Sequence, residues 1–368
     1  MQVDMHYYCV YCIARIAGFH KKPAMTIAYA SQYVDDSSST IEYNHENGSK
    51  SISAATAHHP PDIRNLDPND QRNIWVPFHF FPGGEGEYFT EKLICRKDSL
   101  LINLAVDHYI SLDKPYELEL LGIAMHVYMD TFAHYGFSGV SSRRNRIIGD
   151  SLVFHNDVSA GNKLERKVHL WFKKYGEQGQ LLQNIRSIIS EGIELISGAL
   201  GHGGCSIYPD LPYLKWEFEY EYTTPTLEEE VVVRDNPATF LEACQKVFYI
   251  FRRFLKTHPQ YEDLRASGKI DKFLSNYEEI LAFEGDKHER SLKWCEYAKK
   301  RNTLFVGSGE IIPFYNADKW NKNHAYFTEL SNVKDFSSTP VFRFFQAANY
   351  HHHYSLRELL PEHGIIVI

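Results

Sequence analysis

The sequence has few cysteines and no long apolar run. Six cysteines among 368 residues are too few for a disulfide-stapled scaffold. No stretch of about 18 apolar residues is present, so we expect no membrane-spanning helix. Basic residues are also in deficit, because 39 Lys and Arg face 47 Asp and Glu, for a net charge of −8. That balance argues against a protein that coats DNA.

A signal for export is also missing at the start of the sequence. Residues 1–4 carry no basic side chain, and His6 and Arg15 interrupt the apolar segment that follows. We therefore expect a cytoplasmic protein, with secretion by a route that needs no signal left open.

The composition is that of a globular protein, with 43% hydrophobic and 14% aromatic residues. A chain of this length buries roughly three quarters of its unfolded surface. Apolar spacing and break signals predict helices at 5–19, 24–34, 97–111, 115–135, 163–176, 179–200, 237–256, 271–283, 286–301, 339–350 and 354–360. Pro115 suits the first position of its helix.

Strand is expected in only two places. Residues 216–233 predict a short hairpin, and residues 40–72 predict strand or loop. Helical patterns continue through each point where a domain boundary might fall. The sequence therefore predicts one mainly α domain over 1–368, with a motif-bearing core at about 1–220 and C-terminal helices at about 237–368 packing on it.

Histidine is the residue type in excess, with 19 copies, and three ionisable residues recur at one helical spacing. His126, Asp130 and His134 stand four residues apart, which places all three on one side of a helix. A His–Asp–His row offers the nitrogen and oxygen ligands that zinc prefers.

The ordinary alternative is a set of hydrogen-bonded polar residues in a core, which is the usual explanation for a single buried histidine. Burying three unpaired ionisable groups on one apolar helix would cost about a few kcal/mol for each group. A bound cation would offset that cost, so the spacing favours a metal site.

Further candidate ligands stand at the ends of predicted elements, where side chains from different segments can meet. Each alone has an ordinary explanation as a helix cap, a turn residue or a partner of the helix dipole. The glycines that flank His202 indicate close approach of the backbone. These candidates are Asp4, His6, Asp35, Asp36, His79, His202 and Asp210.

Four motifs in order carry a resemblance to a known superfamily. They are VDMHYYCVYCIARIAGF, IAYASQYVDD, HVYMDTFAHYGFSG and GHGGCSIYPDLPYLKW. This order resembles the zinc-dependent phospholipase C and single-strand nuclease superfamily, whose members are all-α enzymes with a trinuclear zinc cluster. It resembles still more closely a bacterial family of uncharacterised proteins related to that superfamily. The resemblance covers roughly residues 1–220, and a weaker resemblance is present near the end of the chain in FFQAANYHHHYSLRELLP.

The resemblance implies a ligand set for each zinc ion. A first ion would take His79, His126 and Asp130 together with Asp36 or Asp35. A second ion would take His134, His202 and Asp210, and a third would take Asp4 and His6 with Asp130 as a bridge. In the secreted enzymes the amine of an N-terminal Trp is a ligand, whereas Met1 is not an obvious processed end. Two or three ions are therefore expected, and iron or manganese also suits such ligands.

The chemistry implied is hydrolysis of a phosphodiester or a phosphomonoester by a metal-activated water. Asp35 or Asp36 would orient that water or accept its proton. A phospholipid is slightly preferred over nucleic acid, because the chain is acidic and its aromatic residues could line a pocket. The alternatives are a single-strand nuclease or nucleotidase of the same superfamily and a non-catalytic, metal-stabilised helical module that binds a partner protein.

Three other signals are given ordinary explanations. Cys9 and Cys12 fall inside an apolar helix and are expected to be buried thiols. The triplet His351–His353 is expected to be a solvated helix end, with a smaller chance of reaching the site. The basic run 141–146 is expected to be a solvated loop, with contact to a substrate phosphate as the alternative.

Overall fold

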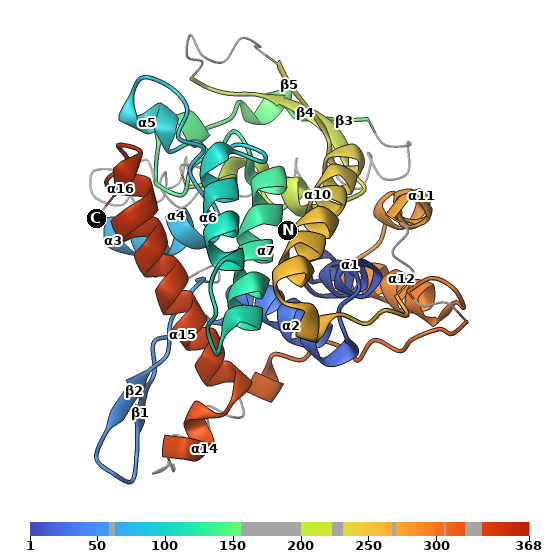
Figure 1. Cartoon of the computed structure of the whole chain (residues 1–368). Helices are drawn as coiled ribbons and strands as arrows, with labels where there is room; N and C mark the ends of the chain where they lie inside the picture. Colours follow the sequence, from blue (N-terminus) through green and yellow to red (C-terminus); the bar gives the residue numbers. More distant parts are fainter. Residues whose placement is uncertain are drawn as a thin grey trace.

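The computed structural model describes residues 1–58, 63–155, 200–222, 231–266, 270–304, 307–320 and 333–367. The fold is mainly α-helical, with two small antiparallel sheets (Figure 1). The longer helices are α1 (Val10–Ala17), α2 (Lys21–Asp36), α6 (Leu100–Ile110), α7 (Glu117–His134), α10 (Asn236–Thr257), α11 (Ile270–Leu281), α12 (Lys287–Lys299) and α15 (Pro340–His353).

Short helical segments complete the described helices. Three are π-helical and continue directly into α-helix: η1 (Asp4–Cys9), η3 (Gln71–Trp75) and η11 (Tyr354–Leu359). The short α-helices are α3 (Pro68–Asp70), α4 (Val76–Phe78), α5 (Phe89–Lys92), α14 (Val333–Ser337) and α16 (Leu360–Glu362). Single 3₁₀ turns are η2 (Ile63–Leu66), η4 (Arg143–Asn145), η5 (Gly149–Ser151), η8 (Gly203–Cys205), η9 (Tyr208–Asp210) and η10 (Pro259–Tyr261).

Helix α7 lies at the centre of the bundle. It packs against α2, α6, α10 and α15, and its residues are buried along almost its whole length (Figure 1). At Gly122 a side chain would place its Cβ 2.5 Å from the backbone oxygen of Ile27 in α2. Glycine therefore lets α2 and α7 approach closely.

Local signals explain where several of these helices begin and end. The hydroxyl of Ser99 accepts the backbone N–H of Ile102 at the start of α6, and the Asp235 carboxylate caps α10 in the same way. Gly18, with φ of +118°, ends α1 in the left-handed conformation that favours glycine. Pro115 lies two residues before α7, so the prediction that it starts the helix is wrong.

One core joins the N-terminal and C-terminal helices, and a smaller one lies beneath a sheet. Strands β3 (Val153–Phe154), β4 (Lys215–Glu219) and β5 (Val231–Asp235) form that antiparallel sheet in chain order. Trp216 and Phe218 of β4 pack there with Phe137. The second sheet is the hairpin of β1 (Glu42–Asn44) and β2 (Lys50–Ile52), which extends away from the bundle (Figure 1).

The mainly α prediction is confirmed, and so is the hairpin between β4 and β5. Strand β3, which completes that sheet, was not predicted. The helices expected at 163–176 and 179–200 lie outside the described residues. Among the residues that the structure describes, no helix combines the length and apolar character needed to cross a membrane.

Candidate metal centre

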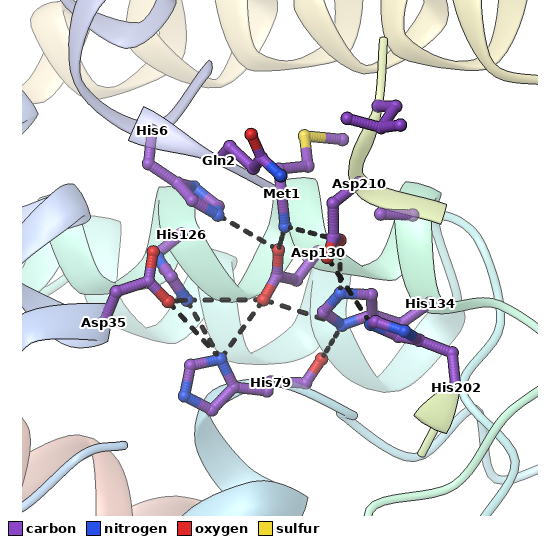
Figure 2. A network of polar contacts seen from close by, with 12 residues as sticks. Met1, Gln2, His6, Asp35, His79, His126, Asp130, His134, His202 and Asp210 are labelled. Carbon is purple, nitrogen blue, oxygen red and sulfur yellow. Dashed lines mark hydrogen bonds and ion pairs between the residues drawn. The ribbon is translucent and has the colours of Figure 1, made fainter. Parts of the chain in front are cut away.

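The second half of α7 presents His126, Asp130 and His134 to a buried polar cluster (Figure 2). All three side chains are buried, as the one-sided spacing and the central position of α7 require. Residues from the N-terminal turn, from α2, from the segment after α4 and from the turns at 202–210 surround them.

Asp130 is the focus of this cluster. Its Oδ1 lies 2.6 Å from the Met1 amine nitrogen and 3.1 Å from His6 Nε2. Its Oδ2 is buried without a hydrogen-bond partner among the described residues. That oxygen nevertheless lies 3.3 Å from His126 Nε2 and 3.4 Å from His79 Nδ1. A buried carboxylate oxygen surrounded by nitrogens that do not donate to it is costly unless a cation is present.

The histidine tautomers explain why these nitrogens do not donate. Because a carbonyl oxygen only accepts, each ring nitrogen bonded to one must carry the proton, and the other nitrogen of a neutral ring then holds a lone pair. These anchors are His126 Nδ1 to Ser31 O at 2.8 Å, His79 Nε2 to Thr56 O at 2.9 Å, His134 Nδ1 to His79 O at 2.8 Å, and His202 Nδ1 to Ser206 O at 2.7 Å. Such backbone anchors are typical of histidines that bind metals.

The electrostatics keep several of the rings neutral and the carboxylates charged. Burial lowers the pKa of His79 and, more strongly, that of His6, and it lowers the pKa of His202 to about 4. Burial alone would raise the pKa of Asp130, yet His134 and the Met1 amine hold it well below its usual value. For Asp210, too, the Met1 amine and His202 outweigh burial and lower the pKa. Neutral imidazole and ionised carboxylate are the forms that bind metal.

The ligand atoms fall into three overlapping groups, each with its members' atoms within 4.8 Å of one another. All three groups draw on α7, and His126 is shared by two of them. The groups are His6, His126 and Asp130; Asp35, His79 and His126; and His134, His202 and Asp210. Seven of the nine metal ligands expected from the sequence therefore come together.

The choice between the two aspartates at the end of α2 has a clear geometric answer. Asp35 Oδ1 lies 3.9 Å from His126 Nε2 and 4.0 Å from His79 Nδ1. Asp36 points elsewhere, because its Oδ2 accepts the Tyr315 hydroxyl at 2.6 Å and the Gln32 amide at 3.3 Å. Of the two aspartates left open by the sequence, Asp35 therefore lies with the histidines as a candidate ligand, and Asp36 does not.

Asp4 also lies outside the centre. Its two carboxylate oxygens accept bonds from the Arg290 guanidinium at 2.8 and 3.2 Å, and both side chains are buried. An arginine held this closely satisfies the charge that a metal ion would otherwise balance. The expected pair of Asp4 and His6 is therefore divided, and only His6 faces the cluster.

The Met1 amine is the member of the cluster that the sequence did not predict. It lies 2.6 Å from Asp130 Oδ1 and 3.1 Å from Asp210 Oδ1 (Figure 2). Burial would lower the pKa of this amine, but the two carboxylates raise it to about 11. A search for side-chain motifs passes over a backbone nitrogen, and the resemblance to enzymes with a Trp amine ligand was the only signal that pointed to it.

The remaining signals have structural explanations. Cys9 and Cys12 are buried free thiols, as expected. His351 is buried and belongs to none of the three ligand groups, and it bonds to Pro77 O at 2.8 Å and to the Tyr109 hydroxyl at 2.9 Å. The expectation of a solvated helix end is therefore wrong for His351. In the basic run, Arg144 lies 3.5 Å from Glu91 Oε1.

The fold and these contacts define a mainly α-helical protein with a buried His/Asp centre suited to divalent cations. Residues 1–359 match the model of a family of unknown function, DUF6765, and the chain belongs to that family. No curated protein and no solved structure shows a significant match to the chain.

Proposed function

We propose that this protein is a metal-dependent phosphoesterase, with zinc as the first candidate and two or three ions per chain. The observation that carries the proposal is the environment of Asp130 Oδ2, a buried oxygen that has no donor within the described part of the chain and that lies among histidine lone pairs. Histidine nitrogen and carboxylate oxygen suit zinc best, and iron or manganese also accepts them. The resemblance to the zinc-dependent phospholipase C and nuclease superfamily supports the same metal.

The three groups of ligand atoms would hold the ions, and the Met1 amine beside Asp130 and Asp210 would be an additional ligand once the ion had displaced its proton. When bound, the ions would supply positive charge for a phosphoryl oxygen and would lower the pKa of a water. The backbone anchors of His79, His126 and His202 keep their lone pairs directed inward. His134 Nε2 is instead paired with Asp210 Oδ1 at 3.0 Å, and it would give up that proton when an ion binds.

Access to the centre is confined to a few side chains. Asp35 is 27% exposed, while His202 and Asp210 are 16% and 14% exposed. We assign to Asp35 the role of accepting a proton from the attacking water, because it meets both solvent and the cluster, and burial raises its pKa. Asp36, held by Tyr315, is assigned the role of fixing the end of α2.

For the substrate we propose a phosphoester of small size, with a phospholipid headgroup ahead of nucleic acid. The net charge of −8 disfavours a long polyanion. Aromatic rings beside the ligands offer an apolar wall, since Trp75 packs on His79 and Phe80 stacks on His134 with centroids 4.8 and 4.6 Å apart. The compartment proposed is the cytoplasm.

A metal count combined with a substrate panel tests this function. Protein purified without a histidine tag is analysed for zinc, iron and manganese, and is then assayed with phosphatidylcholine vesicles, a nucleotide and single-stranded DNA. We expect two or three ions per chain and hydrolysis that stops on chelation. His126→Ala should lose metal and activity, while His258→Ala, which removes a buried histidine far along the chain from these ligands, should keep both. Hydrolysis that survives complete chelation would refute the proposal.

The deep burial of the cluster favours one second candidate, a metal-stabilised module without catalysis. His126 and Asp130 are almost inaccessible to solvent, as in closed structural metal sites. This alternative predicts a full complement of metal, a large loss of stability on chelation and no turnover of any member of the panel.

A further inference from the structure

Arg290 of α12 is a buried arginine that contacts the N-terminal turn. Its Nε and Nη2 donate to the two oxygens of Asp4, Nη2 also donates to Gln2 Oε1 at 2.5 Å, and Nη1 donates to Gly285 O at 2.5 Å. Arg290 is 2% exposed and Asp4 is 1% exposed. The whole guanidinium is thus used to tie residues 2–4 to the start of α12.

The same guanidinium reaches a second segment of the centre. Its carbon lies 5.8 Å from the ring centroid of Tyr213, within the range of a cation–π contact. Tyr213 follows Asp210 by three residues, in the turn that brings Asp210 to the Met1 amine. Arg290 therefore contacts both segments that meet at Met1, although it touches none of the proposed ligands.

His6 is the ligand that depends most on this support. Four other histidines are anchored to backbone carbonyls, whereas His6 Nδ1 is buried without a hydrogen-bond partner among the described residues. The contacts that orient its ring are the bond to Asp130 and stacking on His126, with centroids 3.9 Å apart. The position of the His6 ring therefore depends on where the backbone of the N-terminal turn lies. In that turn the His6 N–H donates to Gln2 O at 3.0 Å.

We propose that Arg290 is a positioning residue of the metal centre, which holds the N-terminal turn so that His6 and the Met1 nitrogen stay against Asp130. This inference rests on the metal centre put forward under the proposed function. It replaces the expected role of Asp4 as a metal ligand with a role as the partner of Arg290. A guanidinium with two bonds to one carboxylate fixes both distance and orientation, which a lysine would not do.

Zinc titration of metal-free protein separates the two roles of Asp4. If Arg290 positions the turn, Arg290→Gln and Asp4→Asn should each weaken zinc binding at one site about 10- to 100-fold, the effect usual for a residue that orients a ligand. The double variant should be no worse than either single variant, because both changes break the same contact. Arg290→Lys should fall in between. If Asp4 is itself a ligand, Asp4→Asn alone will lose the ion, and that result overturns the inference.

Arg15 offers a matched control in the same N-terminal helix. It too is a buried arginine paired with a carboxylate, with Nη2 3.0 Å from Glu310 Oε2, but it stands nine residues beyond His6. Arg15→Gln should lose stability and yet bind zinc with unchanged affinity. If Arg15→Gln weakens zinc binding as much as Arg290→Gln does, the effect is general destabilisation and the positioning role is refuted.

Hydrogen exchange of metal-free protein distinguishes failure of this inference from failure of the proposed function. We expect backbone amides of residues 3–8 to exchange at least tenfold faster in Arg290→Gln, and not in Arg15→Gln. Unchanged exchange in Arg290→Gln together with unchanged zinc affinity refutes the positioning role alone. Wild-type protein that takes up no zinc, iron or manganese refutes the metal centre and this role with it.

Discussion

The two ends of helix α7 bury ionisable side chains in opposite ways. At its start, Glu117 accepts the Tyr261 hydroxyl at 2.7 Å, and burial raises the pKa of Glu119 to about 7. Near its end, Asp130 stays ionised, because His134 and the Met1 amine hold its pKa well below the usual value. Glu117 and Glu119 stand in the first turn of α7, where the helix dipole favours negative charge.

The difference shows what a buried carboxyl does when the fold itself satisfies it. Glu119 can take up a proton, and Glu117 Oε1 accepts a hydroxyl. Glu117 Oε2 has no hydrogen-bond partner among the described residues, and a single histidine nitrogen, His258 Nε2, lies 3.6 Å from it. Asp130 neither takes up a proton nor accepts a hydroxyl. Its Oδ2 faces His79 and His126 nitrogens whose lone pairs also point inward. The open oxygen at the start of the helix faces one histidine, whereas near its end several ligand atoms lie within 4.8 Å of one another, as binding of a cation requires.

Replacing Asp130 should give the largest effect and would test this contrast directly. Asp130→Asn should abolish binding of at least one ion per chain, and it should lower the free energy of unfolding of metal-free protein by about 3–5 kcal/mol, since the Met1 amine loses a buried partner. Metal analysis and urea denaturation measure the two effects. If Asp130→Asn binds zinc with wild-type affinity, the end of α7 near Asp130 does not bind a cation and the contrast with the start of the helix is wrong.

Zinc itself should stabilise the wild-type protein by a somewhat smaller amount. At a free concentration a thousand times the Kd, binding to the folded state alone adds about 4 kcal/mol to the free energy of unfolding. Denaturation with and without zinc measures it, and His126→Ala should show a much smaller response, because two of the three groups lose a ligand. A response in His126→Ala equal to that of wild type would place the metal elsewhere.

The sequence was sufficient to predict the α7 half of the centre, for a physical reason. His126, Asp130 and His134 are related by helical geometry alone, and that geometry does not depend on the rest of the fold. His79, His202 and Asp210 were predicted from their order and from the family resemblance, and the structure brings them to the same place.

Other features of the site depend on contacts that no local pattern encodes. The partner of Asp4 is Arg290, 286 residues later in the chain. Asp35 and Asp36 are adjacent in sequence, and only the rotation of α2 against α7 decides which one faces His126. For the fold, helices followed from apolar spacing, whereas the two-residue strand β3 exists only because β4 pairs with it.

The start of α7 provides a pH test of the comparison. A raised pKa means that folded protein holds the Glu119 proton from about pH 4.5 to about pH 7 while unfolded protein releases it. This residue therefore favours folding below its unfolded pKa and loses that contribution as pH rises towards 7. Glu119→Gln, which mimics the protonated form, should match wild type near pH 4.5 and exceed it by about 3 kcal/mol at pH 7.5.

Denaturant titrations of both proteins at several pH values measure this difference, with zinc content as the control. Zinc affinity should be the same in both proteins, because Glu119 stands about two turns of helix before His126. A constant stability difference across the pH range would mean that Glu119 is ionised when buried, as Asp130 is.

The smallest effect is expected for the hydroxyl that satisfies Glu117. Tyr261→Phe removes the 2.7 Å bond to Glu117 Oε1 and should lower the free energy of unfolding by about 1 kcal/mol, since this tyrosine is partly exposed and water can replace its hydroxyl. Tyr249→Phe, at an exposed tyrosine, is the control and should change almost nothing. Zinc affinity should stay at the wild-type value in both variants. A loss of several kcal/mol in Tyr261→Phe would show that Glu117, like Asp130, depends on a partner that solvent cannot replace.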